Sequence, residues 1–363
     1  GVVWDEIQKA NKKIKLRKIE KIIENISINR DLIKFINWFS MYNLTPKGMV
    51  LKMCLGDEKN ILKKDILIKN LNLKKNIYQL NLDQKKSLKK LNSFGSDFNV
   101  SVLQGITGSG KTLVYFEKIK EIIQENKQAL ILLPEIFLTN QFKERFKNYF
   151  GFEPAIWHSK ITPKNKRIIW KGVINNEIKI LVGARSSLLL PFKKIGIIIV
   201  DEEHDPSYKQ DEGVTYNARD MAISRASFEN VPVYLITSVP SLETFNNIIN
   251  KKYNITKLTK RFDDFPLPEA KIINLNLSKL KKNEYIADDT IDLVKYYLKK
   301  KEQVLFFLNR RGYSPFMICK KCGYKHSCPH CSIYLTFHKS IEKLICHHCG
   351  FKRTKEKKYE KEN

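Results

Sequence analysis

Short apolar segments alternate with amphipathic segments between residues 99 and 238 of this chain. The segments NVSVLQGI, QALILLPE, PAIWHS, IKILVGA, IGIIIVDEE and PVYLITS are apolar over most of their length. Such runs are typical of strands buried on both faces of a sheet. Between them, TLVYFEKIKEIIQEN and TNQFKERFKNYF carry apolar residues every three or four positions, as helices do. The pattern predicts an α/β fold, in which helices cover both faces of a parallel sheet.

Both ends of the chain follow other patterns. Residues 5–55 have apolar side chains at helical spacing with lysines between them, which predicts a helical N-terminal segment that ends near Pro46 and Gly48. Residues 56–80 are charged and rich in Lys and Asn, so they form either a linker or a reduced small domain. The segment VLFFLN at 304–309 predicts a further strand, and residues 353–363 predict a disordered tail.

The chain is strongly basic, with 66 Lys and Arg against 38 Asp and Glu and a formal net charge of +28. Charge alone leaves two explanations open: neutralisation of nucleic-acid phosphate, or an AT-rich genome that favours Lys over Arg. No run of about 18 uncharged apolar residues is present, so no transmembrane helix is expected. The chain begins without Met and without the apolar core of a signal peptide, which suggests a fragment.

Residues 105–112, GITGSGKT, fit the phosphate-binding pattern G-x-x-x-x-G-K-[ST] between a predicted strand and a predicted helix. Glycines let successive backbone N–H groups turn toward phosphate oxygens, and the helix N-terminus adds a partial positive charge. Lys111 would reach the β- and γ-phosphates of ATP, and the Thr112 hydroxyl would bind Mg²⁺. The predicted ATP-binding residues of this loop are Gly105, Thr107, Gly108, Ser109, Gly110, Lys111 and Thr112.

Two acids follow the predicted strand IGIIIV. Asp201 would hold Mg²⁺ and Glu202 would polarise the attacking water, so these two acids and Lys111 are the predicted catalytic residues. His204 has two interpretations: it links the ATP site to a substrate-binding surface, or it is an ordinary loop histidine.

Six of the seven cysteines fall between residues 319 and 349 as three C-x-x-C pairs, whereas Cys54 stands alone. Each pair presents two thiolates, and two pairs complete the tetrahedron around a structural zinc ion. Four thiolates leave no open position, so a catalytic zinc is not expected, and disulfides are not expected beside a cytosolic ATPase. The predicted zinc ligands are Cys319, Cys322, Cys328, Cys331, Cys346 and Cys349.

The phosphate loop followed by Asp-Glu-x-His resembles the superfamily 2 helicases. A longer series, QGITGSGKTLVYFEKI, WHSKIT, GARSSLLLPF, VDEEHDPSYKQDEGVTYNARDMAISRA and VLFFLNRRGYSP, is similar in order and spacing to the PriA family of primosomal helicases. The resemblance runs from about residue 80 to 350, and NWFSMYNLTPKGMVL resembles the end of that family's N-terminal DNA-binding domain.

This resemblance implies a 3′-to-5′ ATP-dependent DNA helicase that uses ATP, Mg²⁺ and Zn²⁺. Its implied substrates are forked and single-stranded DNA at abandoned replication forks. Its implied partners are primosome proteins, single-strand-binding protein and the replicative helicase that is reloaded. The implied location is the bacterial cytoplasm, at the nucleoid.

The resemblance also implies roles for single residues. Gln84, in LNLDQKKSL on an exposed helix, matches a glutamine that reads adenine. Residues 208–220 match an aromatic-rich loop that links single-strand binding to ATP hydrolysis, with Val214 where the family has Trp. The residues implied in DNA binding or coupling are Arg185, His204, Tyr208, Lys209, Tyr216 and Arg219. For Arg185, a structural salt bridge is the alternative.

Two departures from the family pattern stand out. Residues 237–240 read TSVP where such helicases read S-A-T-P, so Val239 replaces a threonine and the motif is degraded. The family has four C-x-x-C pairs and two zinc ions, of which the second and third pairs share one. The fourth pair is absent from residues 350–363, so the first site is half-built unless a histidine substitutes. The candidates, which are equally interpretable as surface residues, are His326, His330, His338, His347 and His348.

The predicted organisation has six parts. They are a remnant of an N-terminal DNA-binding domain at 1–55, a linker or reduced winged-helix region at 56–80, helicase lobe 1 at 81–262, the start of lobe 2 at 263–316, a zinc insert at 317–352 and the tail. Lobe 2 is expected to be incomplete, without its arginine finger. Whether the truncation is natural, a cloning boundary or a frameshift stays open.

Three functional classes follow from these observations. The first is the helicase, and the second is a truncated, catalytically weak DNA- and zinc-binding remnant of it. The third is another superfamily 2 motor, such as a type I restriction translocase, against which the zinc block argues. Much of the lysine excess lies in residues 8–24, 58–90 and the tail, outside the motifs, so genomic bias explains most of the net charge.

Overall fold

The computed structural model describes residues 27–55, 78–134, 137, 139–211, 213–261, 269–275, 286–307, 324–331, 333–338, 341–347 and 349–354. The chain divides into two compact units, residues 1–267 and 268–363, and each is described by itself. The helix predicted within residues 5–24, most of the segment 56–80, the first C-x-x-C pair and the tail beyond residue 354 lie outside the described residues. Within the described ranges, no helix has the length and apolar character needed to cross a bilayer.

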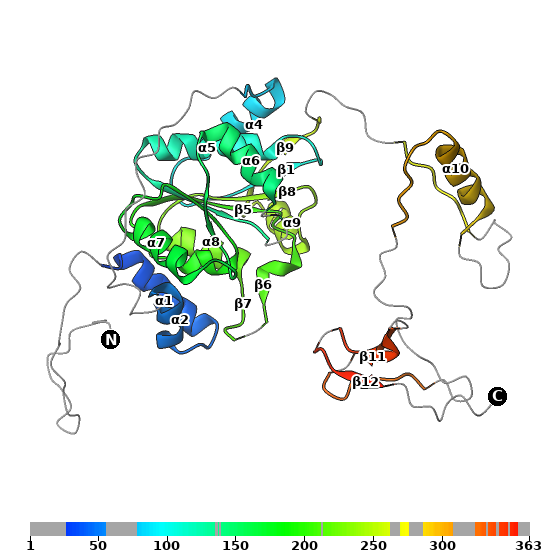
Figure 1. The fold of residues 1–363 in the computed structure, drawn as a ribbon. Helices are drawn as coiled ribbons and strands as arrows, with labels where there is room; N and C mark the ends of the chain where they lie inside the picture. Colours follow the sequence, from blue (N-terminus) through cyan, green and yellow to red (C-terminus); the bar gives the residue numbers. More distant parts are fainter. Residues whose placement is uncertain are drawn as a thin grey trace. The chain divides into compact units, whose positions relative to one another are not determined.

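A seven-stranded sheet forms the centre of the first unit (Figure 1). Its strand order is β3-β4-β2-β5-β8-β1-β9, and all neighbouring strands are parallel. The strands are β1 (Val100–Gly105), β2 (Gln128–Leu132), β3 (Ala155–Trp157), β4 (Ile180–Gly183), β5 (Ile195–Asp201), β8 (Val233–Thr237) and β9 (Asn254–Leu258). The predicted α/β fold with a parallel sheet is therefore confirmed.

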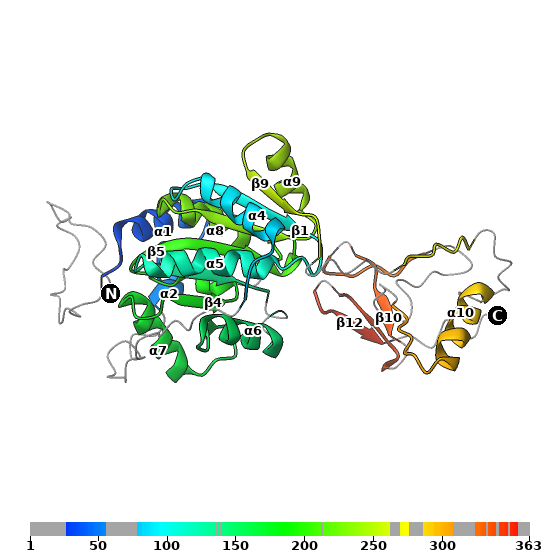
Figure 2. The same cartoon turned by 90° about the horizontal axis from the view of Figure 1, so that it is seen from above.

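Helices cover both faces of this sheet. One face carries α4 (Leu82–Ser93), α5 (Lys111–Gln124) and α6 (Asn140–Phe150), and the other carries α7 (Pro163–Ile174) and α8 (Ala218–Phe228). Figure 2 shows α5 lying across the middle of the sheet. In the central strand β5, Ile197 and Ile199 join the core beneath α5 and α6, whereas Ile198 and Val200 join the core on the α7 and α8 side. Because both faces are buried, the strand is apolar at every position.

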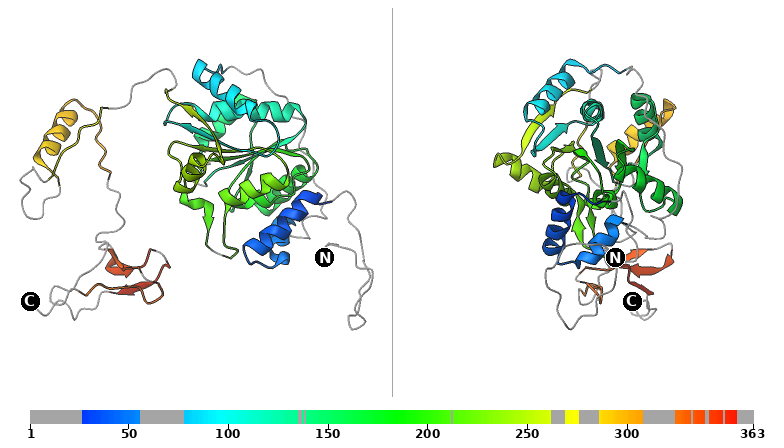
Figure 3. Two further views of the ribbon diagram at one scale, coloured as in Figure 1. Left: turned by 180° about the vertical axis from the view of Figure 1, so that it is seen from behind. Right: turned by 90° about the vertical axis from the view of Figure 1, so that its left-hand side faces the viewer.

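Two N-terminal helices, α1 (Arg30–Tyr42) and α2 (Lys47–Leu55), pack on the α8 side of the sheet (Figure 3). The Asn29 side chain caps α1 by accepting from the Leu32 N–H at 2.6 Å. The ring of Phe35 lies 6.0 Å from that of Phe228 in α8. At the end of α2, the carbonyl of Cys54 accepts from the indole N–H of Trp170 in α7 at 2.9 Å. The N-terminal helices therefore share one hydrophobic core with the sheet.

The second unit contains α10 (Asp288–Lys299) and an antiparallel three-stranded sheet of β10 (Thr336–His338), β11 (Lys343–Ile345) and β12 (Lys352–Thr354). The strand predicted at 304–309 is wrong for its described part, because residues 304–307 form none. Leu305 and Phe307 are 88% and 82% exposed. A strand needs a neighbour for its backbone hydrogen bonds, and no described strand lies beside this segment.

Candidate ATPase site and zinc centre

Three strand ends meet at one edge of the sheet. β1 ends at Gly105, β5 ends at Asp201 and β8 ends at Thr237, and the three strands are neighbours in the order β5-β8-β1. In open α/β sheets, ligands bind outside the carboxyl ends of the strands. The phosphate loop, the acidic pair and the TSVP segment therefore share the edge at which such a site forms.

The phosphate loop has the backbone that a cradle for anions requires. Gly108 and Gly110 have φ angles of 83° and 77°, a left-handed conformation that side chains disfavour. A Cβ on Gly105 would lie 2.5 Å from the Ser109 Oγ, so this turn also has no space for a side chain. The loop leads directly into α5, whose N-terminus carries a partial positive charge. These residues fit the triphosphate of ATP.

Two cations contact carbonyl groups of this loop. The Lys111 Nζ donates to the Gly105 carbonyl at 2.8 Å. The Arg261 Nε donates to the Thr107 carbonyl at 3.2 Å. Lys111 is a predicted site residue, whereas Arg261 was not recognised in the sequence because it lies 154 residues from Thr107 and belongs to no motif. Both positive groups stand where phosphate charge would be neutralised.

Gln84 supports the loop from α4. Its side chain is fully buried, so its predicted position on an exposed helix is wrong. The Gln84 Nε2 donates to the Ser109 carbonyl at 3.0 Å, and its Oε1 accepts from the Asn81 N–H at 3.0 Å. The second bond is half of a capping box at the start of α4. The adenine-reading role stays a prediction, because both ends of this amide already have protein partners.

Asp201 is held by Tyr115, which no sequence motif indicated. The Tyr115 hydroxyl donates to the Asp201 Oδ2 at 2.9 Å, and the Glu202 N–H donates to Oδ1 at 3.0 Å. Burial, together with the neighbouring Glu202 carboxylate, raises the pKa of Asp201 to about 6, although these two hydrogen bonds lower it. The Tyr115 hydroxyl also interacts with the Thr112 hydroxyl. Thr112 and Asp201, the two predicted Mg²⁺ ligands, therefore lie around one tyrosine oxygen, and these oxygen groups suit Mg²⁺.

His204 connects the acidic pair to the TSVP segment. Its Nδ1 lies 2.8 Å from the Thr237 Oγ1 and 3.7 Å from the Glu202 Oε2. The Thr237 hydroxyl donates to the Val239 carbonyl at 2.8 Å, so it accepts from His204, which fixes the proton on Nδ1. Of the two interpretations of His204, this contact supports the linking one. Thr237 keeps this contact although Val239 departs from the family pattern.

The aromatic-rich loop buries its two tyrosine side chains, although most of the other described residues between 206 and 217 are exposed. It contains η3 (Pro206–Tyr208) and a two-stranded hairpin of β6 (Lys209–Gln210) and β7 (Tyr216–Asn217). The Tyr208 hydroxyl lies 2.5 Å from the Asp201 carbonyl and 3.0 Å from the Leu132 carbonyl. Tyr208, Val214 and Tyr216 are 2%, 7% and 3% exposed. The two tyrosine rings therefore offer no face for a base here, and their stacking role stays a prediction that requires the loop to open.

The three predicted DNA-contact cations fall into two groups. Arg219 is buried and its guanidinium pairs with Glu203 and Asp220 at 3.3 and 2.8 Å, so it lies in the interior rather than at the surface. Lys209 is exposed, and Arg185, in η2 (Arg185–Leu189), donates to the Lys209 carbonyl at 2.7 Å. Lys209 and Arg185 remain candidates for DNA contact.

The zinc centre lies in the second unit. The sulfur atoms of Cys328, Cys331, Cys346 and Cys349 all lie within 4.8 Å of one another. The closest pairs are 3.4 and 3.3 Å apart. Zinc–sulfur bonds of about 2.3 Å in a tetrahedron place sulfurs about 3.8 Å apart, so the four thiolates fit one zinc ion. This grouping is the one that the family resemblance implied for the second and third pairs.

The structure describes only some of the other candidate metal ligands. Cys319, Cys322 and His348 lie outside the described residues. The Nε2 atoms of His338 and His347 lie 2.8 Å apart, a separation that also fits a hydrogen bond between two imidazoles. The role of the histidines as substitute ligands stays a prediction.

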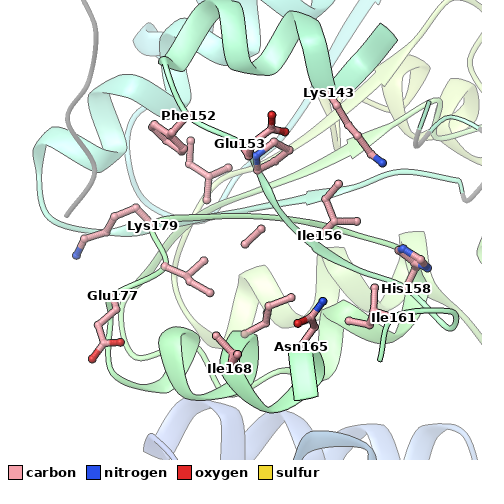
Figure 4. A pocket seen from close by; sticks show the side chains of 15 residues that line it. Lys143, Phe152, Glu153, Ile156, His158, Ile161, Asn165, Ile168, Glu177 and Lys179 are labelled. Atoms are coloured by element: carbon pink, nitrogen blue, oxygen red, sulfur yellow. The ribbon is translucent and has the colours of Figure 1, made fainter. Parts of the chain in front are cut away.

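A cavity of about 460 Å³ opens beside the edge strand β3 (Figure 4). Its walls are mostly apolar, with Phe152 and Ile156 inside and Lys143, Glu177 and Lys179 at its margin. None of the residues predicted for ATP, DNA or metal lines it. No residue of the phosphate loop lines this cavity, so the cavity is not part of the candidate ATPase site.

Three family models match separate parts of the chain. A DEAD/DEAH box helicase model matches residues 81–247, the part that contains the phosphate loop and the acidic pair. A model described as the PriA DNA helicase Cys-rich region matches residues 328–353, the zinc centre. A model described as a 3′ DNA-binding domain of PriA matches residues 1–56.

The chain is also similar to curated replication restart proteins PriA. It is 41% identical to that of Rickettsia conorii over 97% of this chain and 54% of the relative. It is 41% identical to that of Haemophilus influenzae over 72% of this chain and 36% of the relative, and 37% identical to that of Bacillus subtilis over 70% and 32%. The chain thus spans about half the length of the Rickettsia relative. Among solved structures, the DUF1998 helicase MrfA aligns at 19% identity over 65% of this chain and 37% of that chain, with a TM-score of 0.41.

Proposed function

The chain belongs to the PriA family of DNA helicases, and from this premise we propose that it is an ATP-dependent 3′-to-5′ DNA translocase of replication restart. The observation that carries the proposal is the meeting of the phosphate loop, Asp201, Glu202 and Thr237 at one sheet edge. Nucleotide hydrolysis needs phosphate contacts and a metal–water site in one place. The contact of His204 with Thr237 connects the proposed metal–water site to the TSVP segment, through which DNA binding would influence hydrolysis.

The roles of the site residues follow from their positions. The N–H groups of the loop and the Lys111 ammonium bind the triphosphate and offset its charge. Thr112 and Asp201 would hold Mg²⁺, which would supply electrostatic stabilisation to the transferring phosphoryl group. Glu202, partly exposed beside Asp201, orients the attacking water and accepts its proton. Tyr115 keeps the Asp201 carboxylate in place through its hydrogen bond.

The DNA that the protein is proposed to bind is forked and single-stranded. Lys209 and Arg185 supply exposed or half-exposed cations on the hairpin side of the site. Tyr208 and Tyr216 would stack on bases once the loop opens. By family membership, we include primosome proteins, single-strand-binding protein and the replicative helicase as partners, and the bacterial nucleoid as the location. The four-cysteine zinc ion has a structural role in this proposal.

Nucleotide binding and turnover test the proposal directly. Binding of a fluorescent ATP analogue and ATPase rates with and without single-stranded DNA are measured for the wild type, Lys111→Ala and Lys120→Ala. Lys120 lies on the same helix, where it pairs with Glu117 at 3.5 Å, and is the matched control. We expect Mg²⁺-dependent binding and DNA-stimulated turnover that Lys111→Ala abolishes and Lys120→Ala retains. Binding without DNA-stimulated turnover would favour the catalytically weak remnant, and no binding at all would refute both.

A further inference from the structure

A buried carboxylate next to the catalytic acid has no role in the chemistry described so far. Glu203 is 1% exposed. Its Oε1 accepts from the Ser241 N–H at 2.8 Å. Its Oε2 accepts from the Thr244 hydroxyl at 2.9 Å and from the Arg219 guanidinium at 3.3 Å, and lies 3.1 Å from the Ser241 Oγ. Every oxygen of this carboxylate is therefore engaged by a group from another element.

The partners of Glu203 belong to two helix starts. Ser241 is the N-cap of α9 (Leu242–Ile249), and Thr244 lies in its first turn. Arg219 lies in the first turn of α8, immediately after the strand β7 of the aromatic-rich loop. Arg219 also donates to the Ser241 Oγ at 2.7 Å, so the network is closed on itself. Glu203 thus joins the acidic pair, the end of the aromatic-rich loop and the residue after TSVP.

The backbone just before Glu203 is strained. Glu202 has a φ angle of 49°, in the left-handed region that a residue with a Cβ disfavours. Such a conformation persists only where the surrounding structure holds it. Glu203 stabilises this conformation of Glu202 through its backbone and its side chain. Its N–H donates to the Ile236 carbonyl at 3.1 Å. Its carboxylate is fixed by Ser241, Thr244 and Arg219.

We infer that Glu203 and Arg219 are positioning residues: their buried ion pair fixes the orientation of Glu202 and transmits movement of the aromatic-rich loop to it. This inference rests on the proposed function and adds residues to it. Opening of the loop pulls on Arg219 through Asn217, whose Oδ1 accepts from the Arg219 N–H at 3.0 Å. Displacement of Arg219 shifts the Glu203 carboxylate through their ion pair, and this shift changes the orientation of the adjacent Glu202 side chain. Neither positioning residue touches the phosphate loop, so we expect their substitution to change nucleotide affinity far less than turnover.

Glu243 provides a matched control. Its carboxylate also faces the Arg219 guanidinium, at 3.7 Å, and interacts with Ser241, but its side chain is 71% exposed. The substitutions Glu203→Gln and Glu243→Gln therefore remove the same charge from the same cation, one on its buried side and one on its solvent side. Thr244→Val is a milder variant, since it removes one donor to Glu203 and keeps the ion pair and the side-chain shape. Arg219→Lys keeps the positive charge and tests partial rescue.

The experiment measures the affinity of a fluorescent ATP analogue with and without single-stranded DNA, the kcat and KM for ATP, and thermal unfolding. For Glu203→Gln we expect nucleotide affinity without DNA within about twofold of the wild type, and loss of the change in affinity that DNA produces. We also expect kcat per nucleotide-binding molecule to fall at least about tenfold with KM little changed. Because unfolding of part of the sample would lower the apparent kcat in the same way, the stoichiometry of nucleotide binding and the thermal unfolding curve must show that the assayed protein is folded. Glu243→Gln should behave as the wild type, and Thr244→Val and Arg219→Lys should be intermediate.

Two results would overturn this inference. One is a Glu203→Gln protein, or a folded Thr244→Val protein if Glu203→Gln does not fold, with wild-type DNA response and wild-type kcat. The other is an equal loss in Glu243→Gln, which would point to net charge rather than position. Failure of the proposed function is distinct, because there the wild type itself would bind no nucleotide or show no response to DNA.

Discussion

The ring of Phe39 in α1 meets the ring of Tyr216 in β7 edge-on, with 5.3 Å between the ring centroids and an interplanar angle of 65°. The N-terminal segment, which matches a 3′ DNA-binding domain, therefore touches the aromatic-rich loop inside one hydrophobic core. Burial raises the pKa of Tyr216 to about 12, which agrees with the dry surroundings of its hydroxyl. Part of the loop that is proposed to sense DNA is thus held by the N-terminal helices.

Removing the Phe39 ring should destabilise the first unit. Phe39→Ala leaves a cavity between α1, α8 and the loop, and truncation of a buried Phe costs about 3–5 kcal/mol of the free energy of unfolding. Chemical denaturation of the wild type and variant measures this. Met41→Ala, at a side chain 68% exposed on the same helix, should cost less than about 0.5 kcal/mol. A Phe39→Ala loss below about 1 kcal/mol would show that the N-terminal helices do not contribute to this core.

Gln84→Ala should separate support of the phosphate loop from recognition of adenine. Its buried amide holds the Ser109 carbonyl, so its removal should weaken ATP and GTP binding by a similar factor and lower stability by about 1–3 kcal/mol. Titration with fluorescent analogues of both nucleotides decides. Lys85→Ala, at the next, exposed position of α4, is the control. A loss confined to ATP would instead establish adenine reading, and no loss would exclude both roles.

Tyr115→Phe should shift the pH dependence of Mg²⁺-dependent nucleotide binding. In the proposed site Mg²⁺ binds the deprotonated Asp201, so affinity is expected above the pKa of this carboxyl, about 6, and should be lost as pH falls through it. The Tyr115 hydrogen bond lowers that pKa, so its removal raises the pKa, and the loss of affinity should begin at higher pH. Binding curves between pH 5 and 8 test this expectation.

Tyr234→Phe is the matched control for this experiment. Tyr234 is fully buried in the same core as Tyr115, but its hydroxyl has no hydrogen-bond partner among the residues that the structure describes. We expect its curve to follow that of the wild type. Coincident curves for Tyr115→Phe and the wild type would show that the Tyr115 hydroxyl does not set the pKa of Asp201.

Cys346→Ser should remove one zinc ion per chain. Cys346 is fully buried among the four thiolates, and three remaining ligands hold zinc far more weakly than four. Metal analysis after dialysis measures the stoichiometry, and limited proteolysis should show cleavage within residues 328–354. Cys54→Ala changes a cysteine of the other unit and should leave the zinc content unaltered. Unchanged zinc in Cys346→Ser would place the ion elsewhere.

The sequence was most informative where one local pattern determines the structure. Six of the seven strands of the sheet and the GITGSGKT loop depend on residues close together in the chain, and they were predicted in their observed places. The edge strand β9, which has a lysine and a partly exposed end, was not predicted. Tyr115 and Glu203 were not recognised, because their importance arises from contacts with Asp201 and Arg219 that only the fold creates. The same reason explains why the burial of Tyr208 could not be predicted. Aromatic composition indicates what a ring can do but not which element covers it.

The segment 304–307 shows the converse limit. Its apolar pattern is as strong as that of β5, yet it forms no strand within the described residues. An apolar strand pattern indicates that a segment suits a sheet, but the segment forms a strand only where a neighbouring strand is present. Sequence pattern alone therefore predicted the sheet of the first unit better than it predicted any element of the second.

The bond from Lys111 to the Gly105 carbonyl has a consequence for which molecules the loop accepts. The ammonium has three N–H donors, and one of them already bonds to this neutral carbonyl. For that donor, a ligand gains only the difference between the carbonyl and its own acceptor. A nucleoside, which brings no anionic oxygen, gains almost nothing by this exchange. A triphosphate replaces a neutral carbonyl with a charged oxygen and gains the stronger, charge-assisted bond. The bond of this lysine to a carbonyl thus favours ligands that carry more negative charge, whatever base they carry.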